Sequence, residues 1–147
     1  MAQPDGLTPA VEDYAKAIYT LEERWGSAST NDLAALLDVK PGSVSGMLRK
    51  LSSLGLVEHE LYHGVRLTER GRRIALEVIR HHRLLELFLV EDLGMTEDEV
   101  HAQAEVLEHA LSEELEELIA RKLGDPTVDP HGETIPSREL TLPRATR

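Results

Sequence analysis

The stretch Ser29-Thr-Asn-Asp-Leu-Ala-Ala-Leu-Leu-Asp-Val-Lys-Pro-Gly-Ser-Val-Ser-Gly-Met-Leu-Arg-Lys-Leu51 decides the fold of the first half of the chain. Residues 32–37 predict a short amphipathic helix, and residues 38–41 predict a tight turn. A second helix is expected over residues 43–55, with Val44, Leu48 and Leu51 on its inner face. Two short helices joined this way are typical of a helix-turn-helix motif, although any short helical hairpin resembles it.

The residues that follow strengthen this interpretation. Residues 56–62 and 65–68 predict two short strands about a turn at His63-Gly64. A β-hairpin directly after a recognition helix is a wing. His59, His63 and Arg66 are either ordinary exposed hairpin residues or phosphate contacts, and the sequence favours neither.

The outer face of the second helix suits duplex DNA. Gly42, Ser45 and Gly46 are small enough to let a helix lie close to base edges, whereas Arg49 and Lys50 are long enough to reach phosphates. We assign DNA contacts to Lys40, Ser43, Ser45, Arg49 and Lys50.

Two further helices flank this region. The first is expected from Pro9 to Trp25, with Thr8 as its N-cap and Gly26 at its end. Taken alone, Glu12 and Asp13 in its first turn are best explained by the helix dipole. The second runs from residue 68 to about residue 93, with an apolar stripe of Ile74, Val78, Leu85, Leu89 and Leu93.

His82 and Glu86 fall on that apolar stripe, one turn apart. Polar groups on a buried face need partners, because an unpaired buried charge is costly. They are either a core histidine hydrogen-bonded to a carboxylate or two metal ligands presented by one helix.

A second group of metal-ligand residue types lies in His101-Ala-Gln-Ala-Glu105-Val-Leu-Glu108-His109. On a helix these two histidines and two glutamates fall within an arc of about 100°. Imidazole and carboxylate donors suit Mn, Fe and Zn, and the chain has no Cys to favour Zn or Cu(I). The alternative is an ordinary solvated helix face.

Composition bounds the class of protein. The 147 residues suffice for one domain or two small ones, and 41% are hydrophobic, as in a folded, soluble, mostly helical protein. The start lacks an apolar signal core, and the longest apolar run, residues 84–90, is interrupted by Glu86. We therefore expect a cytoplasmic protein with no membrane partner.

The net charge of −11 is unevenly distributed. Residues 40–83 hold nine Lys or Arg against four Glu, whereas residues 84–125 hold thirteen acidic residues against Arg121 and Lys122. The first of these regions suits an anion such as DNA, and the second suits cations.

We therefore predict a mostly α protein: a winged helix-turn-helix DNA-binding domain at 1–73, then an all-helical dimerisation and metal-binding domain at 74–124. Further helices are expected after Thr96 and after Ser112. Three leucine-rich helices cannot bury their apolar surface alone, so we expect a homodimer. Residues 125–147 are expected to be an extended tail or linker.

Taken together, these features resemble the diphtheria toxin repressor family of metal-dependent regulators, including its manganese transport regulator branch. The motifs that carry the resemblance are Glu12-Asp-Tyr14, Ser43-Val-Ser45, Leu67-Thr-x-x-Gly71, His82-Arg-Leu-x-Glu86, and His101 with Glu105-x-x-Glu108-His109. The resemblance implies a primary metal site at Asp13, Glu105, Glu108 and His109, together with a backbone carbonyl. It implies a second site at His82, Glu86 and His101.

The resemblance also bears on the metal. Iron-responsive members tend to have sulfur-containing residues at the positions of Asp13 and Glu105, whereas carboxylates stand here. Oxygen ligands favour Mn(II), and Fe(II) is the alternative. Lys16 replaces a carboxylate of the bacillus-type manganese branch, so that branch's binuclear geometry is not expected. Residues 131–136 look like the linker to the SH3-like domain of longer members.

The resulting hypothesis is a Mn(II)-activated, dimeric repressor that binds operator DNA of metal-uptake genes. Two alternatives are an Fe(II)-responsive regulator of the same family and a winged-helix regulator that answers to a non-metal ligand. We do not expect an enzyme or a small-molecule substrate. The chain has no paired Glu-x-x-His motifs and no Gly-rich phosphate loop, and its H-E-x-x-H string at residues 59–63 lies in the predicted hairpin instead of on the helix that a zinc hydrolase needs.

Overall fold

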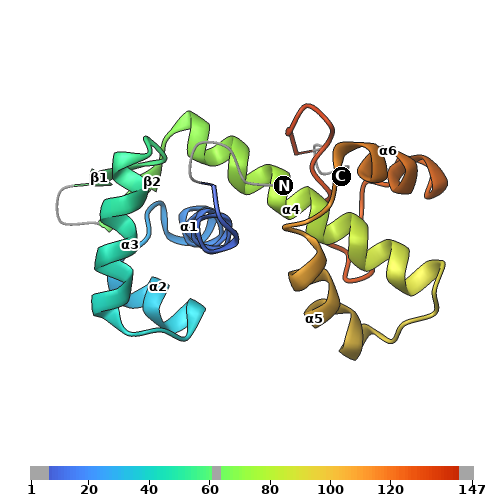
Figure 1. Cartoon of the computed structure of the whole chain (residues 1–147), viewed down its shortest axis with the longest axis horizontal. Helices are drawn as coiled ribbons and strands as arrows, with labels where there is room; N and C mark the ends of the chain where they lie inside the picture. Colours follow the sequence, from blue (N-terminus) through green and yellow to red (C-terminus); the bar gives the residue numbers. More distant parts are fainter. Residues whose placement is uncertain (1–6, 61–63, 143–147) are drawn as a thin grey trace. The chain divides into compact units, whose positions relative to one another are not determined.

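The computed structural model describes residues 7–60 and 64–142, which belong to two compact units (Figure 1). The first unit is Met1–Ala75 and the second is Leu76–Arg147, so the boundary falls inside one helix. The elements in chain order are α1 (Pro9–Trp25), α2 (Thr30–Leu37), α3 (Pro41–Ser53), β1 (Val57–Glu60), β2 (Gly64–Leu67), α4 (Glu69–Glu91), α5 (Glu97–Leu107) and α6 (Glu113–Lys122).

The ends of the first helices are set by the residues that the sequence singled out. The Thr8 hydroxyl accepts a hydrogen bond from the Val11 amide at the start of α1, and Gly26 ends that helix with φ 86°. Ser29 caps α2 in the same way. Asp38 ends α2 in the left-handed conformation, and this reversal sends the chain into α3.

The helix-turn-helix motif and its wing are confirmed. α2 contacts both α1 and α3, and β1 pairs antiparallel with β2 from Val57↔Leu67 to Glu60↔Gly64. The expected turn lies partly outside the described residues, because residues 61–63 are not among them. The core of this unit is apolar and includes Ile18, Leu33, Val44, Leu48, Leu51, Leu56 and Val65.

The Leu67-Thr-x-x-Gly71 motif joins the wing to α4. The Thr68 hydroxyl donates to the carbonyl of Gly55 at 2.7 Å and accepts from the Gly71 amide at 3.1 Å. A Cβ atom on Gly71 would lie 2.1 Å from the Leu56 carbonyl oxygen. Only glycine therefore allows the first turn of α4 to pack this closely against the chain that enters β1.

α4, α5 and α6 build the second unit around a separate core of Leu84, Leu85, Leu87, Ala104, Ile119, Ala120 and Ile135. The sequence placed Leu93 on the buried stripe of α4, but α4 ends at Glu91 and Leu93 is 63% exposed. That part of the expectation is wrong, because the helix stops before it reaches Leu93. Gly94 then reverses the chain with φ 72°.

α5 starts at the expected cap but with a different side-chain bond. The Thr96 hydroxyl donates to the Glu99 carboxylate at 2.7 Å instead of accepting from the Glu99 amide. α5 ends at Leu107, so Glu108 stands at its C-cap and His109 lies beyond it. Ser112 caps α6 by accepting from the Leu115 amide.

The described part of the expected tail, residues 125–142, contains no helix or strand but packs onto α4 and α6. Ile135 is 1% exposed within the core of the second unit. Arg80 donates to the Pro136 carbonyl at 2.8 Å, and Arg83 donates to the Thr134 carbonyl and the Glu133 carboxylate. An apolar anchor and two arginines therefore hold this segment against the helices.

None of the helices in residues 7–60 and 64–142 is both long enough and apolar enough to cross a membrane.

Candidate metal centre

His82 lies between two buried carboxylates. Its Nε2 atom is 3.0 Å from Glu86 Oε1, and its Nδ1 atom is 2.9 Å from Glu108 Oε2. All three side chains are buried. His82 therefore has a carboxylate oxygen within hydrogen-bonding distance of each ring nitrogen.

His101 of α5 completes a group of three donors with His82 and Glu86 of α4. Its ring meets the His82 ring edge-on, with centroids 4.9 Å apart, and its Nδ1 atom lies 3.7 Å from Glu86 Oε2. One donor atom from each of the three residues lies within 4.8 Å of the others. Imidazole and carboxylate atoms at such spacing are suited to a divalent transition metal.

The nine-residue stretch 101–109, which covers the later part of α5 and the two residues after it, does not act as a single ligand face. His101 Nε2 pairs with Glu105 Oε1 at 3.0 Å on the exposed side of α5. Glu108 is 1% exposed, and its Oε1 atom lies 3.6 Å from His109 Nε2. His101 thus joins the α4 residues, whereas Glu108 and His109 form a neighbouring pair that contacts His82 through Glu108.

His81, the residue before His82 on α4, anchors the backbone of Glu108. Its Nδ1 atom donates to the Glu108 carbonyl at 3.2 Å, and its Nε2 atom donates to Glu116 Oε1 at 2.9 Å. Arg80 holds the other Glu116 oxygen at 2.9 Å. Burial opposes the charge on His81, but the Glu116 carboxylate outweighs it and raises the pKa of His81.

The site has one further histidine that the sequence reasoning did not single out. His131 Nε2 lies 3.3 Å from Glu86 Oε2. Burial alone would raise the pKa of Glu86, but hydrogen bonds and charge from His82 and His131 hold it below its ordinary value. No short-range spacing reveals this contact, because the two residues are 45 positions apart.

Asp13, by contrast, belongs to the first unit, on α1, where it is half-buried. Lys16 lies one turn further along the same helix. The role of Asp13 as a ligand stays a proposal that rests on the family resemblance.

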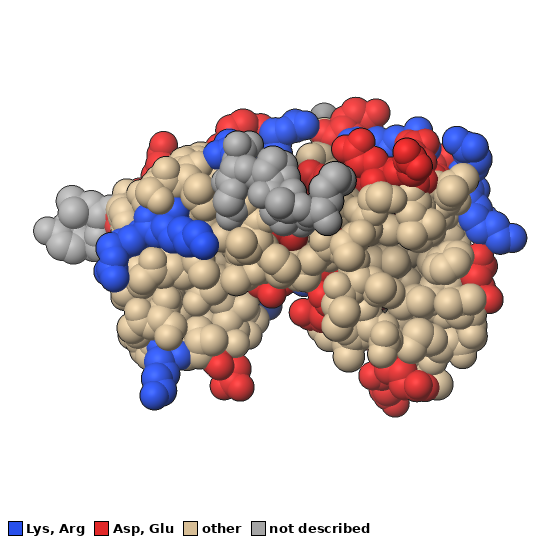
Figure 2. All heavy atoms as spheres, in the orientation of Figure 1, with Lys and Arg blue, Asp and Glu red and all other residues tan. Residues whose placement is uncertain are grey.

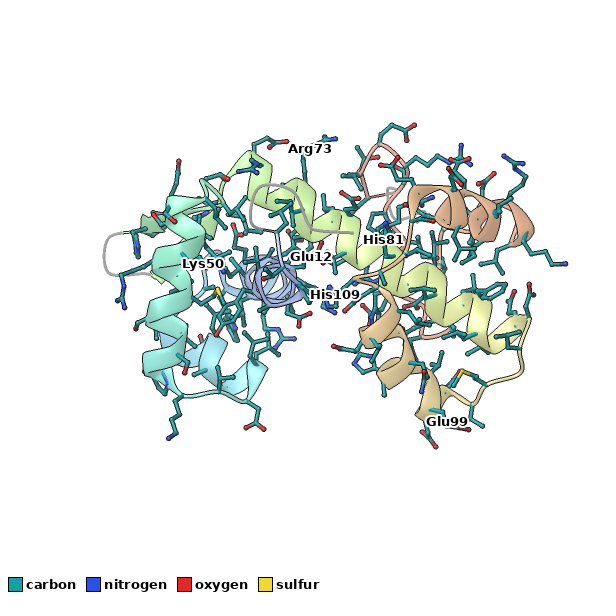
Figure 3. The ribbon with its side chains drawn as sticks, in the orientation of Figure 1. Glu12, Lys50, Arg73, His81, Glu99 and His109 are labelled. Atoms are coloured by element: carbon teal, nitrogen blue, oxygen red, sulfur yellow. The ribbon has the colours of Figure 1, made fainter. Side chains whose placement is uncertain are left out.

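The residues expected to contact DNA lie on and beside α3. Lys40, Ser43, Arg49 and Lys50 are exposed, and Ser45 is half-buried. Figure 3 marks Lys50 on α3, and Figure 2 shows Lys and Arg side chains on the face of the first unit that is in view. The apolar face of α3 is buried through Val44, Leu48 and Leu51.

The donors in this centre are imidazole nitrogens and carboxylate oxygens, and no described side chain in it carries sulfur. Such a donor set fits Mn(II), Fe(II) or Zn(II). Comparison with models of protein families identifies the class of protein that carries this site. Residues 6–65 match "Iron dependent repressor, N-terminal DNA binding domain", and residues 68–137 match "Iron dependent repressor, metal binding and dimerisation domain".

The chain belongs to the iron-dependent repressor family. Its members that resemble this chain are transcriptional regulators, not enzymes. The chain is 40% identical over 105 residues to the HTH-type transcriptional regulator MntR of Geobacillus kaustophilus, covering 71% of this chain and 74% of that protein. It is 36% identical over 130 residues to the iron-dependent repressor IdeR of Mycobacterium tuberculosis, covering 88% of this chain and 56% of IdeR.

Solved structures of the iron-dependent repressor family share this fold. A manganese-dependent transcriptional repressor in complex with manganese superposes with a TM-score of 0.83 at 47% identity, covering 92% of this chain and 62% of that one. The chain thus spans less than two thirds of that protein and of IdeR. The resemblance to the diphtheria toxin repressor family is confirmed, and the relatives include both manganese and iron regulators.

Proposed function

We propose that this chain is a dimeric, Mn(II)-activated transcriptional repressor that binds double-stranded operator DNA of metal-uptake genes. The observation that carries the proposal is the group His82, Glu86 and His101, whose donor atoms lie within 4.8 Å of one another beside the Glu108–His109 pair. A purely structural core would not need three histidines and two carboxylates in one place.

The DNA-binding part of the proposal rests on the winged helix-turn-helix of the first unit. α3 buries its apolar face and leaves Arg49 and Lys50 exposed beside Ser43 and Ser45. Small residues permit close approach to base edges, and the cationic side chains reach phosphates. Two such units in a dimer would contact successive major grooves, about 34 Å apart.

The choice of Mn(II) rests on the donor set. Of the residues implied as ligands of the primary site, Asp13, Glu105 and Glu108 are carboxylates and His109 is an imidazole. The chain has no Cys. Hard oxygen donors are better suited to Mn(II) than they are to softer metals. Fe(II) is the second candidate, because IdeR, a similar protein, is an iron-dependent repressor.

The proposed mechanism by which metal activates DNA binding rests on the negative charges of the primary-site ligands. Asp13 is included in the site because the family resemblance implies it, and it adds a carboxylate to those of Glu105 and Glu108. Carboxylates that face one another repel, and a bound divalent cation supplies the charge that relieves this repulsion. Ligands drawn from both units would then favour the arrangement of the two units that fits DNA.

The test is a titration of metal-stripped protein with Mn(II), run anaerobically beside Fe(II) and Zn(II), for the unmodified chain and for Glu108→Ala. We expect two Mn(II) per chain, with the affinity for one of them at least about 100-fold lower in the variant, because a direct ligand is lost. Glu114→Ala, at an exposed position in the first turn of α6, is the matched control. No saturable binding by the unmodified chain would contradict the proposal.

The DNA step is tested with duplexes selected from a random-sequence pool in the presence of Mn(II). Binding should be lost with a chelator and restored by Mn(II), and Asp13→Asn should weaken the metal dependence. Equal DNA affinity in the presence of chelator and of Mn(II) would favour a regulator that answers to a non-metal ligand. Tighter DNA binding with Fe(II) than with Mn(II), at equal occupancy, would assign iron.

A further inference from the structure

We propose that Arg49 reads a guanine base in the major groove of the operator, an inference that deepens the proposed function and rests on it. The sequence assigned Arg49 and Lys50 to DNA together, as side chains long enough to reach phosphates. The structure places the Arg49 guanidinium over the outer face of α3, beside Gly46. This position favours a contact with a base.

The first support is the low profile of the outer face of α3. A Cβ atom built on Gly42 would have no neighbouring atom within 4 Å, and one built on Gly46 would lie 3.8 Å from the Arg49 Nη2 atom. Ser43, between the first of these glycines and the buried Val44, is small and exposed. A helix with so little side-chain bulk can approach the base edges on the floor of the groove closely.

The second support is the direction of the Arg49 side chain. Long side chains on a helix run back toward its N-terminus and cover the preceding turn. The closeness of the Arg49 Nη2 atom to Gly46, three residues earlier, shows that Arg49 follows this course. The N-terminal part of a recognition helix is the part that contacts base edges. The guanidinium therefore lies about one turn nearer to that part than the Arg49 backbone does.

The third support is that the Arg49 guanidinium is available to a ligand. Other arginines of the first unit have partners within the protein: Arg66 pairs with Glu22 at 3.5 Å, and Arg70 donates to the Leu54 carbonyl at 2.6 Å. Arg49 is exposed, and in the part of the chain that the structure describes no carboxylate or carbonyl binds its guanidinium. Its N–H donors can therefore bind DNA without first breaking an internal ion pair.

The chemistry of the guanidinium selects guanine. Guanine presents two acceptors, O6 and N7, side by side in the major groove, whereas adenine presents an acceptor beside a donor. The planar fork of Arg49 matches the two acceptors, and such a bidentate pair favours guanine over a wrong base by roughly 5- to 150-fold. Lys50, also exposed, carries a compact charge without this fork and is suited to a phosphate.

The competing explanation is that Arg49 contacts only a phosphate. Duplexes are first selected from a random-sequence pool with Mn(II) present, and we expect a recurrent guanine in each half-site. In one half-site this guanine is then replaced by 7-deazaguanine, which keeps Watson–Crick pairing but lacks the N7 acceptor. For the unmodified chain, affinity should fall about 5- to 20-fold, because one of the two hydrogen bonds is lost.

The same pair of duplexes is then bound by Arg49→Ala and by Lys50→Ala. Arg49→Ala should bind the guanine duplex more weakly and show less than about a 2-fold further loss with 7-deazaguanine, because the partner of N7 is already gone. Lys50→Ala is the matched comparison. It should weaken binding to both duplexes by the same factor, so that the full effect of 7-deazaguanine remains. The salt dependence of affinity reports phosphate contacts and is a separate readout.

Thermal unfolding checks that Arg49→Ala is folded; if it is not, Arg49→Met, which keeps the length of the side chain, takes its place. A 7-deazaguanine effect of the same size in the Arg49 variant and in the unmodified chain would overturn the inference, as would selected half-sites without a recurrent guanine. Either result would leave the proposed repressor intact. Failure of the unmodified chain to select any duplex with Mn(II) would overturn both.

Discussion

Two adjacent histidines of α4 have different partners. His81 donates to Glu116 and to the Glu108 carbonyl, whereas His82 faces the carboxylates of Glu86 and Glu108. Both histidines therefore hold Glu108, one through its backbone and the other through its side chain. The position of this proposed ligand depends on a buried charge network and not on α5 alone, which ends one residue before it.

The His81–Glu116 pair predicts a pH dependence of stability for the metal-free protein. The pKa of His81 is raised and that of Glu116 is lowered, in each case because their pairing outweighs burial. The His81 contribution is complete below its unfolded pKa of about 6.5 and is lost as pH rises through the folded value. The Glu116 contribution is complete above its unfolded pKa of about 4.5 and is lost as pH falls through the lower folded value.

The free energy of unfolding should fall between pH 6 and pH 8.5 in the unmodified chain. We expect a smaller fall over this range in His81→Gln, because the charged pair is absent. Urea denaturation of the metal-free protein at several pH values measures it. His59→Gln, a change of an exposed histidine on β1, is the control and should keep the original pH profile. The same decline in both variants and in the unmodified chain would show that His81 carries no such contribution.

At the scale of one element, α3 is the proposed recognition helix. Val44, Leu48 and Leu51 hold it against the core, and the exposed Arg49 lies on the opposite face. Because its guanidinium is outside the core, Arg49 can be changed with little effect on folding. Its loss therefore tests DNA contact separately from stability.

Arg49→Ala should lower affinity for a selected duplex about 10-fold at moderate salt and reduce the slope of log affinity against log salt by about 1, if the residue contacts one phosphate. Fluorescence anisotropy over a salt series, with Mn(II) present, measures both. Lys122→Ala, at the end of α6, removes a charge from the second unit and should change neither quantity. An unchanged slope in Arg49→Ala would place Arg49 away from the phosphates.

For the whole molecule, the second unit leaves large apolar side chains uncovered on α5 and α6. They include Val106, Leu107, Leu115 and Leu118. The chain belongs to a family whose second domain is described as a metal binding and dimerisation domain. We take this apolar surface as the proposed dimer interface.

Leu118, 58% exposed, provides the test. Leu118→Glu should raise the dimer dissociation constant at least about 100-fold, because a charge would be buried against apolar surface. Sedimentation equilibrium measures this, and binding to palindromic duplexes should weaken in parallel while Mn(II) binding is retained. Leu36→Glu, at an exposed leucine of α2, should leave the dimer intact. A dimer of unchanged strength in Leu118→Glu would move the interface elsewhere.

Local sequence determined most of the fold. Thr8, Gly26 and Ser29 set helix ends because capping depends on the hydrogen bonds of a single turn. The helix-turn-helix and the wing follow from short apolar periodicities, and these are confirmed. The pairing of His82 with Glu86 was also visible, since residues four apart lie on one side of a helix.

Tertiary structure decided how the metal-ligand residues are grouped. Helical spacing placed His101, Glu105, Glu108 and His109 on one arc, yet His101 joins His82 and Glu86, whereas Glu108 is buried against His82. The contact of His131 with Glu86 depends on Ile135 entering the core and on Arg83 holding the loop. The His82–Glu108 and Arg83–Thr134 contacts join residues 26 and 51 positions apart. They arise only when helices and loops pack, which no local pattern records.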